Sequence, residues 1–464
     1  GVVYINMRNV KFRDILGTPL MANATKIVLL GAGELGKEIA IEAQRLGVEV
    51  ITVDRYDNPP AAQVAHRHYT VDMRDGNALK AIMYREKPDA IVPEIEAINT
   101  DALVELEEEG FNVIPNAEAT RITMDRIRLR KLAAERAGVR TSRYKFAYNL
   151  DELKDACESI GYPCLVKARM SSGGLGSSIV YDYKDIEKAY EKAVKYARGF
   201  GEHVIVEEMI KFDMEVTELP LACLNLNEKP DILLPRPVGH VRTGSHFHVS
   251  WQPFVDIDEE TDESTVPFQG YGSNLHLMED KTSGKPLWRS EWNDKKLPGK
   301  LVREVENKIY ETAKKVVKCL LGKKGGFGIF GCELFIKFDE KKPEVYFNEI
   351  SPRPHDTGMV TLVSQNMSEM ALHVYAILRL PIPEIINMFP GAAHVILSEK
   401  DRVWGPTYRG LREALMKRNI ILRFFGKPCT YKHRRMGLAL AIGKNTVEAR
   451  VKAMEVAHTI EKGL

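Results

Sequence analysis

The chain has 464 residues, enough for about three domains of ordinary size, and its net charge at pH 7 is +2. This near-neutral charge and an ordinary globular composition argue against a protein built to bind nucleic acids or membrane surfaces. No apolar run approaches the ~20 residues that a membrane span needs, and we expect no signal peptide. The six cysteines are scattered without a C-x-x-C pair, which indicates reduced thiols in the cytoplasm and argues against a zinc site.

The N-terminal part contains a βαβ pattern built round a glycine turn. Residues Lys26–Leu30 and Val48–Val53 predict buried strands, with a helix over Lys37–Leu46 between them. The turn Gly31–Gly36 reads G-x-G-x-x-G, whose glycines let the backbone approach an anion at a helix N-terminus. Asp54 follows at the spacing of a ribose-binding acid, so a dinucleotide site is one interpretation. A sugar-phosphate site and a purely structural turn are the alternatives.

A third strand of this Rossmann-like region is predicted over Ala90–Pro93. It is followed at once by two acids, Glu94 and Glu96. Acids at the carboxyl ends of parallel strands line the crevice where ligands bind, and the alternative is ordinary surface charge.

The middle of the chain predicts a helical segment over Thr123–Ala137 and then a strand over Tyr162–Lys167. A loop rich in glycine and serine follows at Met170–Ser178. Its backbone N–H groups suit phosphates, with Lys167 as a nearby point charge, and the alternative is a flexible linker. A strand predicted over Val204–Ile210 ends in an acidic and apolar patch of the kind that holds a base and ribose, and Glu215 lies just beyond it.

Two alternating apolar runs on either side of Asp339–Pro343 predict a β-hairpin. If the turn centres on Lys341, the opposed pairs are Glu333 with Glu349, Phe335 with Phe347 and Lys337 with Val345. Two opposed carboxylates require a cation between them, and oxygen ligands without Cys or His suit Mg²⁺. The alternative is a different register in which one glutamate is solvated.

Two prolines hold the segment after this hairpin, Ser351–Asp356, in an extended conformation. It therefore presents Arg353, His355 and Asp356 from a stiff backbone at the end of a strand. Near the C-terminus we expect strands over Ile420–Phe425 and Met436–Ile442, with a capped helix from Asn445 to about Lys462.

Taken in order, these pieces resemble the ATP-grasp enzymes, and more specifically the formate-dependent phosphoribosylglycinamide formyltransferases of purine synthesis. The resemblance runs from about Lys26 to the C-terminus and rests on short motifs. They are G-E-L-G-K-E at Gly33–Glu38, V-P-E-I-E-A-I at Val92–Ile98, G-Y-P-C at Gly161–Cys164, V-G-H at Val238–His240, S-W-Q-P at Ser250–Pro253, S-P-R-P-H-D-T-G-M-V-T-L at Ser351–Leu362 and F-G-K-P at Phe425–Pro428.

The resemblance implies an α/β fold with three parts: a Rossmann-like N-terminal domain, a central ATP-grasp domain and a small β-rich C-terminal domain. We place their limits at 1–122, 123–385 and 386–464, with a probable insertion at 254–300 that we expect to be a solvated loop or a small subdomain. The family resemblance also implies a homodimer. ATP would phosphorylate formate, and the amine of glycinamide ribonucleotide would then attack the formyl carbon of formyl phosphate.

The resemblance also assigns residues to each substrate. It implies ATP contacts for Arg126, Lys167, Ser172, Gly173, Gly174, Leu175, Gly176, Ser177, Glu207, Glu208, Met209, Ile210 and Glu215, and Mg²⁺ ligands in Glu333 and Glu349. It implies contacts to glycinamide ribonucleotide for Glu34, Leu35, Glu94, Asp356, Lys427, Arg434 and Arg435. The resemblance therefore implies that the glycine turn serves this sugar phosphate rather than NAD. We expect Lys167, Arg353 and Asp356 to act at the reacting groups. Adjacent strand residues point to opposite faces, so the alternative is that one of Arg434 and Arg435 is only a surface charge. A turn at His433 would let both reach the same phosphate.

Two departures from the family pattern leave other functions open. Leu175 replaces the usual lysine of the glycine loop, which removes one charge that would face phosphate. His246 and His248 stand where an acidic segment is expected, and we expect them to be strand residues rather than metal ligands. The alternatives are the bicarbonate-dependent ATP-grasp carboxylase of aminoimidazole ribonucleotide, a nucleotide-binding sensor without turnover, and an NAD-dependent oxidoreductase.

Overall fold

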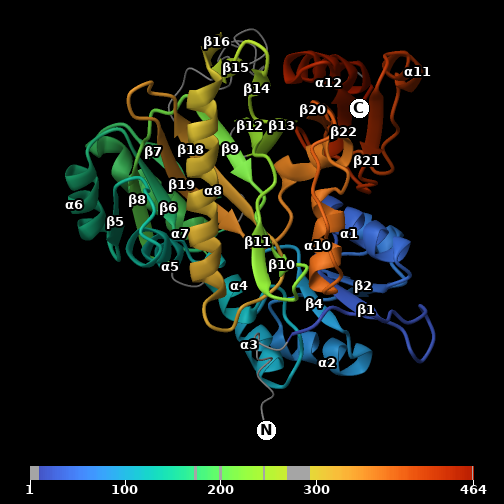
Figure 1. Cartoon of the computed structure of the whole chain (residues 1–464). Coiled ribbons are helices and arrows are strands. Elements are labelled where there is room, and N and C mark those ends of the chain that lie inside the picture. Colours follow the sequence, from blue (N-terminus) through green and yellow to red (C-terminus); the bar gives the residue numbers. More distant parts are fainter. Residues whose placement is uncertain (1–9, 172–174, 198–200, 244–245, 269–292, 462) are drawn as a thin grey trace.

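The computed structural model describes residues 10–171, 175–197, 201–243, 246–268, 293–461 and 463–464 (Figure 1). The N-terminal part is a parallel sheet in the order β3-β2-β1-β4, as the βαβ pattern predicts. Its strands are β1 (Lys26–Leu30), β2 (Glu49–Asp54), β3 (Arg67–Thr70) and β4 (Ala90–Pro93), and its helices are α1 (Glu34–Arg45), α2 (Gly76–Glu86), α3 (Thr100–Glu108) and α4 (Ala117–Met124). Helix α1 begins three residues earlier than predicted, directly after Gly33 of the glycine turn.

The predicted helical segment Thr123–Ala137 is broken at Asp125. Helix α4 ends before this residue, and its carboxylate then accepts hydrogen bonds from the backbone N–H groups of Ile127 and Arg128. Asp125 is thus the N-cap of α5 (Arg126–Lys131), because a short acidic side chain satisfies the unpaired donors of a helix start. A small antiparallel sheet follows, in the order β5-β8-β6-β7. Its strands are β5 (Tyr144–Ala147), β6 (Cys164–Ala168), β7 (Ser178–Val180) and β8 (Val204–Glu208), and the helices of this part are α6 (Leu150–Ile160) and α7 (Ile186–Tyr196).

An eight-stranded sheet forms the centre of the molecule, in the order β19-β18-β9-β12-β13-β20-β22-β21. The strands are β9 (Met214–Glu218), β12 (Val238–Thr243), β13 (His246–Gln252), β18 (Gly331–Lys337), β19 (Glu344–Ser351), β20 (Gly391–Leu397), β21 (Ile420–Phe424) and β22 (Arg435–Ile442). Strand β13 pairs with β20, so the sheet runs without interruption from the central region into the C-terminal region. His246 and His248 lie in β13, as strand residues.

Helix α8 (Gly299–Leu321) lies along the central sheet in Figure 1. Its buried side chains pack into the main hydrophobic core. Val302, Ile309 and Val316 are fully buried in a cluster with Trp251 and Phe347. The remaining elements are β10 (Leu221–Leu224), β11 (Pro230–Leu233), β17 (Gly328–Ile329), α9 (Thr361–Ser364), α10 (Glu369–Ile377), α11 (Leu411–Leu415) and α12 (Thr446–Glu461). The predicted cap of the last helix is confirmed, because Asn445 Oδ1 accepts from Glu448 N at 2.9 Å. Within the described part of the chain, no helix combines the length and apolar composition that crossing a membrane requires.

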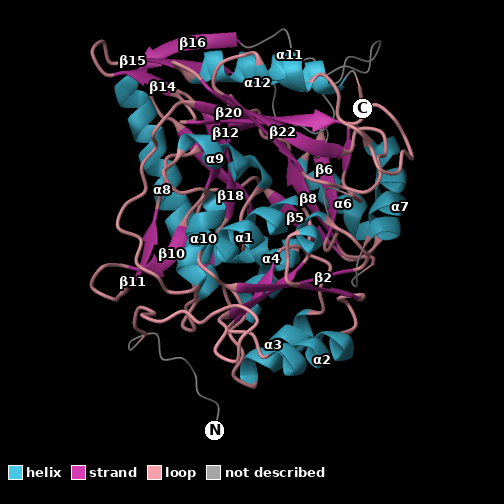
Figure 2. Ribbon diagram, turned by 90° about the vertical axis from the view of Figure 1, so that its right-hand side faces the viewer, coloured by secondary structure: helices cyan, strands magenta, loops and turns pink. Residues whose placement is uncertain are grey.

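The probable insertion is not a solvated loop where the structure describes it. It forms a three-stranded antiparallel sheet of β14 (Asp256–Asp258), β15 (Glu263–Phe268) and β16 (Asn293–Pro298), which lies at the top of Figure 2. Phe254, Val255 and Val266 are buried in the main core, and Asp256 accepts hydrogen bonds from Thr446. The alternative of a small subdomain fits these residues better, because they form a sheet and because β15 buries Val266 and Phe268 in the main core.

Candidate active site

The β18–β19 hairpin brings its two glutamates together. Glu333 is paired with Glu349, as predicted. The other two predicted pairs are wrong: Phe335 is opposite Tyr346, and Lys337 is opposite Glu344. The register shifts by one residue between Glu333 and Leu334, because Asn348 of β19 has no opposed residue. This bulge leaves the carboxylate pair in place while moving every pair between it and the turn.

A cavity of about 940 Å³ collects residues from all three parts of the chain. Most of the predicted site residues line it. They are Glu34, Leu35, Glu94, Arg126, Lys167, Ser177, Glu207, Glu208, Glu215, Glu333, Glu349, Arg353, Asp356, Lys427, Arg434 and Arg435. Four predicted ATP contacts, Leu175, Gly176, Met209 and Ile210, do not line it, and the remaining three, Ser172–Gly174, lie outside the described residues.

Glu207 of β8 forms the centre of a buried charge cluster. Lys167 Nζ, from β6, lies 2.7 Å from Glu207 Oε2, and Arg130 Nη2 lies 2.6 Å from Glu207 Oε1. Burial opposes ionisation of Glu207, but Lys167 and Arg130 outweigh it and lower its pKa to about 2. Arg126 lies nearby, donating to Ser171 Oγ at 2.8 Å, with its Nε 3.4 Å from Glu349. Two cations with an adjacent glycine loop suit the phosphates of a nucleotide.

An apolar and aromatic patch lies beside these charges. The rings of Phe212 and Phe335 are stacked with centroids 4.8 Å apart, and Ile210 and Tyr346 complete the cluster. Phe212 and Phe335 also line the cavity. Phe212 lies three residues before Glu215, and Phe335 is opposite Glu215 where β18 pairs with β9. Burial raises the pKa of Glu215 to about 7, and Arg242 and Lys167 oppose that rise. A flat apolar surface next to a carboxyl group suits a base and its ribose.

The Glu333–Glu349 pair fits a divalent cation that also binds phosphate. Both carboxylates line the cavity, and each already contacts a cation: Glu333 contacts Arg242, and Glu349 contacts Arg126. Burial opposes ionisation of Glu349, but Arg126 and Lys167 lower its pKa. Among the described residues, no group of three or more His, Cys, Asp or Glu side chains could hold a metal ion. Two carboxylates completed by substrate phosphates are the usual arrangement for Mg²⁺.

The opposite end of the cavity joins the glycine turn to the C-terminal strands. Glu34 contacts Lys427 and Arg435, both at 3.3 Å, and Arg435 also donates to Asp356 Oδ2 at 2.8 Å. His433 has a left-handed backbone (φ 65°), which provides the predicted turn, and both Arg434 and Arg435 line the cavity. Burial lowers the pKa of Lys427 to about 8, against the effect of Glu34. Three cations at one end suit a phosphate group.

Glu94 lies against the glycine turn at this end of the cavity, where its Oε2 accepts from Gly33 N at 3.4 Å. It packs so closely that a Cβ at Gly31, whose φ is +111°, would lie 2.5 Å from Glu94 Oε2. Burial raises the pKa of Glu94 to about 8, and Glu34 adds to the rise. Arg353 lies on the same side, with its Nη2 3.0 Å from Glu96.

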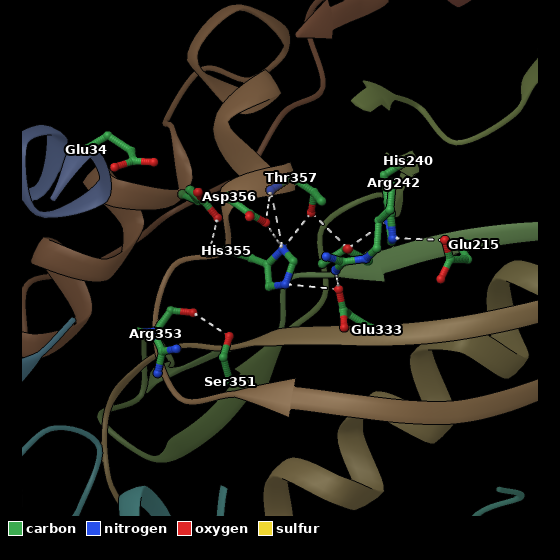
Figure 3. A network of polar contacts seen from close by, with 12 residues as sticks. Glu34, Glu215, His240, Arg242, Glu333, Ser351, Arg353, His355, Asp356 and Thr357 are labelled. Carbon is green, nitrogen blue, oxygen red and sulfur yellow. Dashed lines mark hydrogen bonds and ion pairs between the residues drawn. The ribbon is translucent and has the colours of Figure 1, made fainter. Parts of the chain in front are cut away.

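His355 connects the two ends of the cavity (Figure 3). Its Nε2 faces Glu333 Oε1 at 3.3 Å, and its Nδ1 faces Asp356 Oδ1 at 3.0 Å. Burial opposes ionisation of Asp356, but His355 and Arg435 hold its pKa well below the usual range. The contacts continue through Thr357 and Thr217, whose hydroxyl lies 3.1 Å from His240 Nδ1. One ring therefore contacts both Glu333 of the Glu333–Glu349 pair and Asp356, which is bound to Arg435 at the opposite end of the cavity.

Sequence reasoning missed three charged or aromatic groups of this site. Arg130 lies one turn along α5 from Arg126, a helical spacing that could have indicated it. Phe335 was predicted, but only as a hairpin residue. Arg242 gave no usable signal, because the register of β12 and β13 shifts between Val241 and Arg242 and breaks the alternation that strand patterns rely on.

Three families match the chain in sequence. The ribonucleotide synthetase preATP-grasp domain matches residues 24–124, and the ATP-grasp domain matches residues 132–265 and 297–370. The family described as PurT, C-terminal, matches residues 391–460. These matches and the topology confirm the predicted α/β fold and its three-part ATP-grasp architecture.

Curated relatives match over nearly the whole chain. The formate-dependent phosphoribosylglycinamide formyltransferase of Methanococcus maripaludis strain C7 is 46% identical over 96% of this chain and 99% of its own. The enzyme of the same name from Thermococcus kodakarensis is 47% identical over 97% of this chain and 94% of its own.

Solved structures share the fold. Glycinamide-RNase-transformylase T from Mycobacterium tuberculosis has a TM-score of 0.68 at 28% identity, covering 94% of this chain and 99% of its own. The carboxyaminoimidazole ribonucleotide synthase of Aspergillus clavatus has a TM-score of 0.73 at 21% identity, covering 96% of this chain and 100% of its own. At that identity the second likeness concerns the fold alone.

Proposed function

The chain belongs to the formate-dependent phosphoribosylglycinamide formyltransferases of the ATP-grasp superfamily, and we propose that its cavity formylates glycinamide ribonucleotide at the expense of ATP. The observation that carries this proposal is one cavity lined by two groups of residues. We assign the end with Lys167, Glu207 and Phe335 to the nucleotide, and the end with Lys427, Arg434 and Arg435 to the phosphate of the ribonucleotide. In the first step an oxygen of formate attacks the γ-phosphorus of ATP, and ADP leaves. In the second step the amine attacks the formyl carbon, inorganic phosphate leaves, and the amine loses a proton.

At the nucleotide end, Lys167 and Arg126 neutralise the phosphates, while Phe212, Phe335 and Glu215 hold the base and ribose. Glu333 and Glu349 would hold Mg²⁺. A bound Mg²⁺ supplies charge neutralisation at the phosphates, which phosphoryl transfer needs more than covalent chemistry. The intact Lys167–Glu207 pair and carboxylate pair support turnover despite the change at Leu175, and they argue against a sensor.

At the other end, Lys427, Arg434 and Arg435 bind the phosphate of the ribonucleotide, and Glu34, Leu35, Glu94 and Asp356 surround its glycinamide and ribose. Arg353 and Asp356 project from the loop between the two ends, where the amine meets the activated acid. Enclosure by three parts of the chain keeps water from a reactive acyl phosphate.

We also propose a cellular location and an oligomeric state for the protein. Full-length similarity to purine-synthesis enzymes and the reduced state of all six cysteines support a cytoplasmic enzyme. The family supports a homodimer. The domain limits 1–122, 123–385 and 386–464 remain a prediction, since the central sheet crosses the second of them.

The test is product analysis with ATP, Mg²⁺, [¹³C]formate and glycinamide ribonucleotide. We expect one ¹³C-formyl group in the ribonucleotide for each ADP released. A [¹³C]carboxylated aminoimidazole ribonucleotide, formed from labelled bicarbonate and no formate, would instead support the carboxylase.

A further inference from the structure

Glu369 is a buried acid that has no role in the function proposed so far. It is the first residue of α10, is fully buried and does not line the cavity. Its Oε2 accepts a hydrogen bond from His355 N at 3.0 Å, and its Oε1 has no hydrogen-bond partner among the described residues. Burial of a carboxyl group with an unpartnered oxygen costs stability, so core packing alone does not explain a glutamate at this position.

The loop that Glu369 contacts carries residues assigned above to the reacting groups. Arg353 and Asp356 line the cavity, and so does His355 between them (Figure 3). The contacts of their side chains lie within the site, such as that of Asp356 with Arg435 at 2.8 Å. Glu369 lies outside the cavity and contacts the backbone of the loop, so it can hold the loop without competing with a substrate.

Gly358 provides a second contact between Glu369 and this loop. A Cβ added at Gly358 would overlap Glu369 Oε2, and its three nearest neighbours would all be atoms of the Glu369 carboxyl group. The backbone of Gly358 is not left-handed, so space rather than conformation requires glycine there. Glu369 N also donates to Thr361 Oγ1 at 2.9 Å, which donates to Gly358 O at 2.6 Å. The first residue of α10 therefore contacts the backbone on both sides of Asp356.

Glu369 fits beside this charged loop because its carboxyl group is neutral. Burial raises the pKa of Glu369 to about 8, and the charge of Asp356 adds to the rise, whereas the hydrogen bond from His355 N opposes it. The carboxyl group therefore keeps its proton at pH 7, which avoids repulsion with Asp356. Glutamine is neutral and of the same size, so it is the closest substitute.

We propose that Glu369 is a positioning residue, which holds the backbone of the loop from Arg353 to Gly358 and thereby sets where Arg353 and Asp356 meet the reacting groups. This inference rests on the proposed function. A displacement of about 1 Å at the reacting groups can cost about 10²-fold in rate, even when the altered residue lies far from the chemistry. An acceptor behind the wall of the cavity can therefore control the rate without contacting a substrate.

The experiment compares Glu369→Met and Glu369→Gln with the unaltered protein. Methionine has the length of glutamate but cannot accept strongly from His355 N, so kcat should fall about 100-fold and the KM for glycinamide ribonucleotide should rise. The Kd and stoichiometry of ATP binding, measured by calorimetry, should not change, because the proposed ATP contacts lie on α5, β6 and β8 rather than on the loop. Glu369→Gln keeps the acceptor and the size, so its kcat should stay within a few-fold of the unaltered value.

A matched control is Glu448→Met. Glu448 lies in the first turn of α12, does not line the cavity and accepts a hydrogen bond from Lys444 N at 3.2 Å. Its replacement removes the same kind of bond, from a glutamate at a helix start to a backbone N–H group. Both kcat and the KM for the ribonucleotide should be unchanged.

Gly358→Ala tests the same contact through space instead of hydrogen bonding. With Glu369 present, the added methyl group overlaps its Oε2, so the loop must move and kcat should fall about 10-fold or more. In Glu369→Ala that space is free, so adding Gly358→Ala should change kcat by less than about two-fold. An equal fall in both backgrounds would show that the two residues act independently and would overturn the inference.

Three results from the Glu369 variants would also overturn it. They are an unchanged kcat in Glu369→Met, an equal fall of kcat in Glu369→Gln and Glu369→Met, and a loss of ATP binding in Glu369→Met that matches its loss of rate. These outcomes differ from failure of the proposed function. If the unaltered protein makes no formyl product from formate, the proposed function is wrong. If it does and Glu369→Met is equally active, only the role of Glu369 is wrong.

Discussion

Glu333 and Glu349 lie directly opposite each other across β18 and β19, on the far side of a one-residue bulge from the turn. Replacing either with glutamine removes one anionic ligand without changing its size. We expect Glu333→Gln and Glu349→Gln each to lower kcat by about 10²- to 10³-fold and to raise the Mg²⁺ concentration needed for half-maximal rate. Glu344→Gln is the control, since Glu344 lies on the same strand outside the cavity. An unaltered Mg²⁺ requirement in both cavity variants would contradict the metal assignment.

The β18–β19 hairpin shows which strand pairs could be predicted from the sequence and which could not. Alternating apolar residues predicted both strands and the glutamate pair, because strand periodicity is a local property. The pairs nearer the turn could not be predicted, since the bulge at Asn348 depends on packing between strands and leaves no mark in the alternation. The glutamate pairing was right because an assumed symmetric turn and a bulge displaced the register by compensating amounts.

Lys167 should matter for nucleotide binding more than for folding. Lys167→Met removes one of the two cations that hold Glu207, while Arg130 remains. We expect the Kd for ATP, measured by calorimetry, to rise about 10- to 100-fold. Lys145→Met, at an exposed position of β5, is the matched control. Unchanged ATP affinity in Lys167→Met would exclude the phosphate role.

The binding of the ribonucleotide should depend on pH through Lys427. Burial lowers the pKa of Lys427 to about 8, so this side chain loses its charge as pH rises through that value. The kcat/KM for glycinamide ribonucleotide should then fall above about pH 8. In Lys427→Arg the charge persists, and the fall should move to higher pH. The same decline in both proteins would show that another group causes it.

Glu218 makes the stability of the fold depend on pH, and it does not line the cavity of the candidate active site. It is fully buried on β9, and neither of its carboxylate oxygens has a hydrogen-bond partner among the described residues. Burial, with Glu306 adding to it, raises its pKa well above the usual value of 4.5. The folded state therefore keeps a proton that the unfolded state releases, so stability is lost as pH rises above about 4.5.

Glu218→Gln should remove this cost. We expect its free energy of unfolding, relative to the unaltered protein, to increase by about 1.4 kcal/mol for each pH unit above the unfolded pKa. Denaturant unfolding between pH 5 and pH 8 measures this, with Glu311→Gln on the exposed side of α8 as the control. Parallel pH profiles for Glu218→Gln and the unaltered protein would show that Glu218 is ionised in the fold.

Leu175 offers a test of the altered glycine loop. Its side chain is half exposed, so Leu175→Lys should fold normally. If the loop closes over the phosphates, the added charge should lower the KM for ATP a few-fold. An unchanged KM would mean that this loop binds phosphate through its backbone alone.

Motifs in single segments were predictable, and relationships between segments were not. Lys167, Asp356 and Lys427 each follow from a short local pattern that matches a family. The continuity of the central sheet through β13 and β20, the stacking of Phe212 on Phe335 and the position of Arg242 depend on strands far apart in the sequence. Long-range strand pairing sets these contacts, and no local pattern encodes it.

The most direct test of the account follows oxygen from formate. In the proposed reaction one oxygen of formate attacks the γ-phosphorus and leaves with inorganic phosphate when the amine takes the formyl group. With [¹⁸O₂]formate, ATP and glycinamide ribonucleotide, mass spectrometry should find one ¹⁸O in each phosphate released and one in each formyl product. Unlabelled phosphate formed at the rate of formylation would contradict activation of formate by ATP.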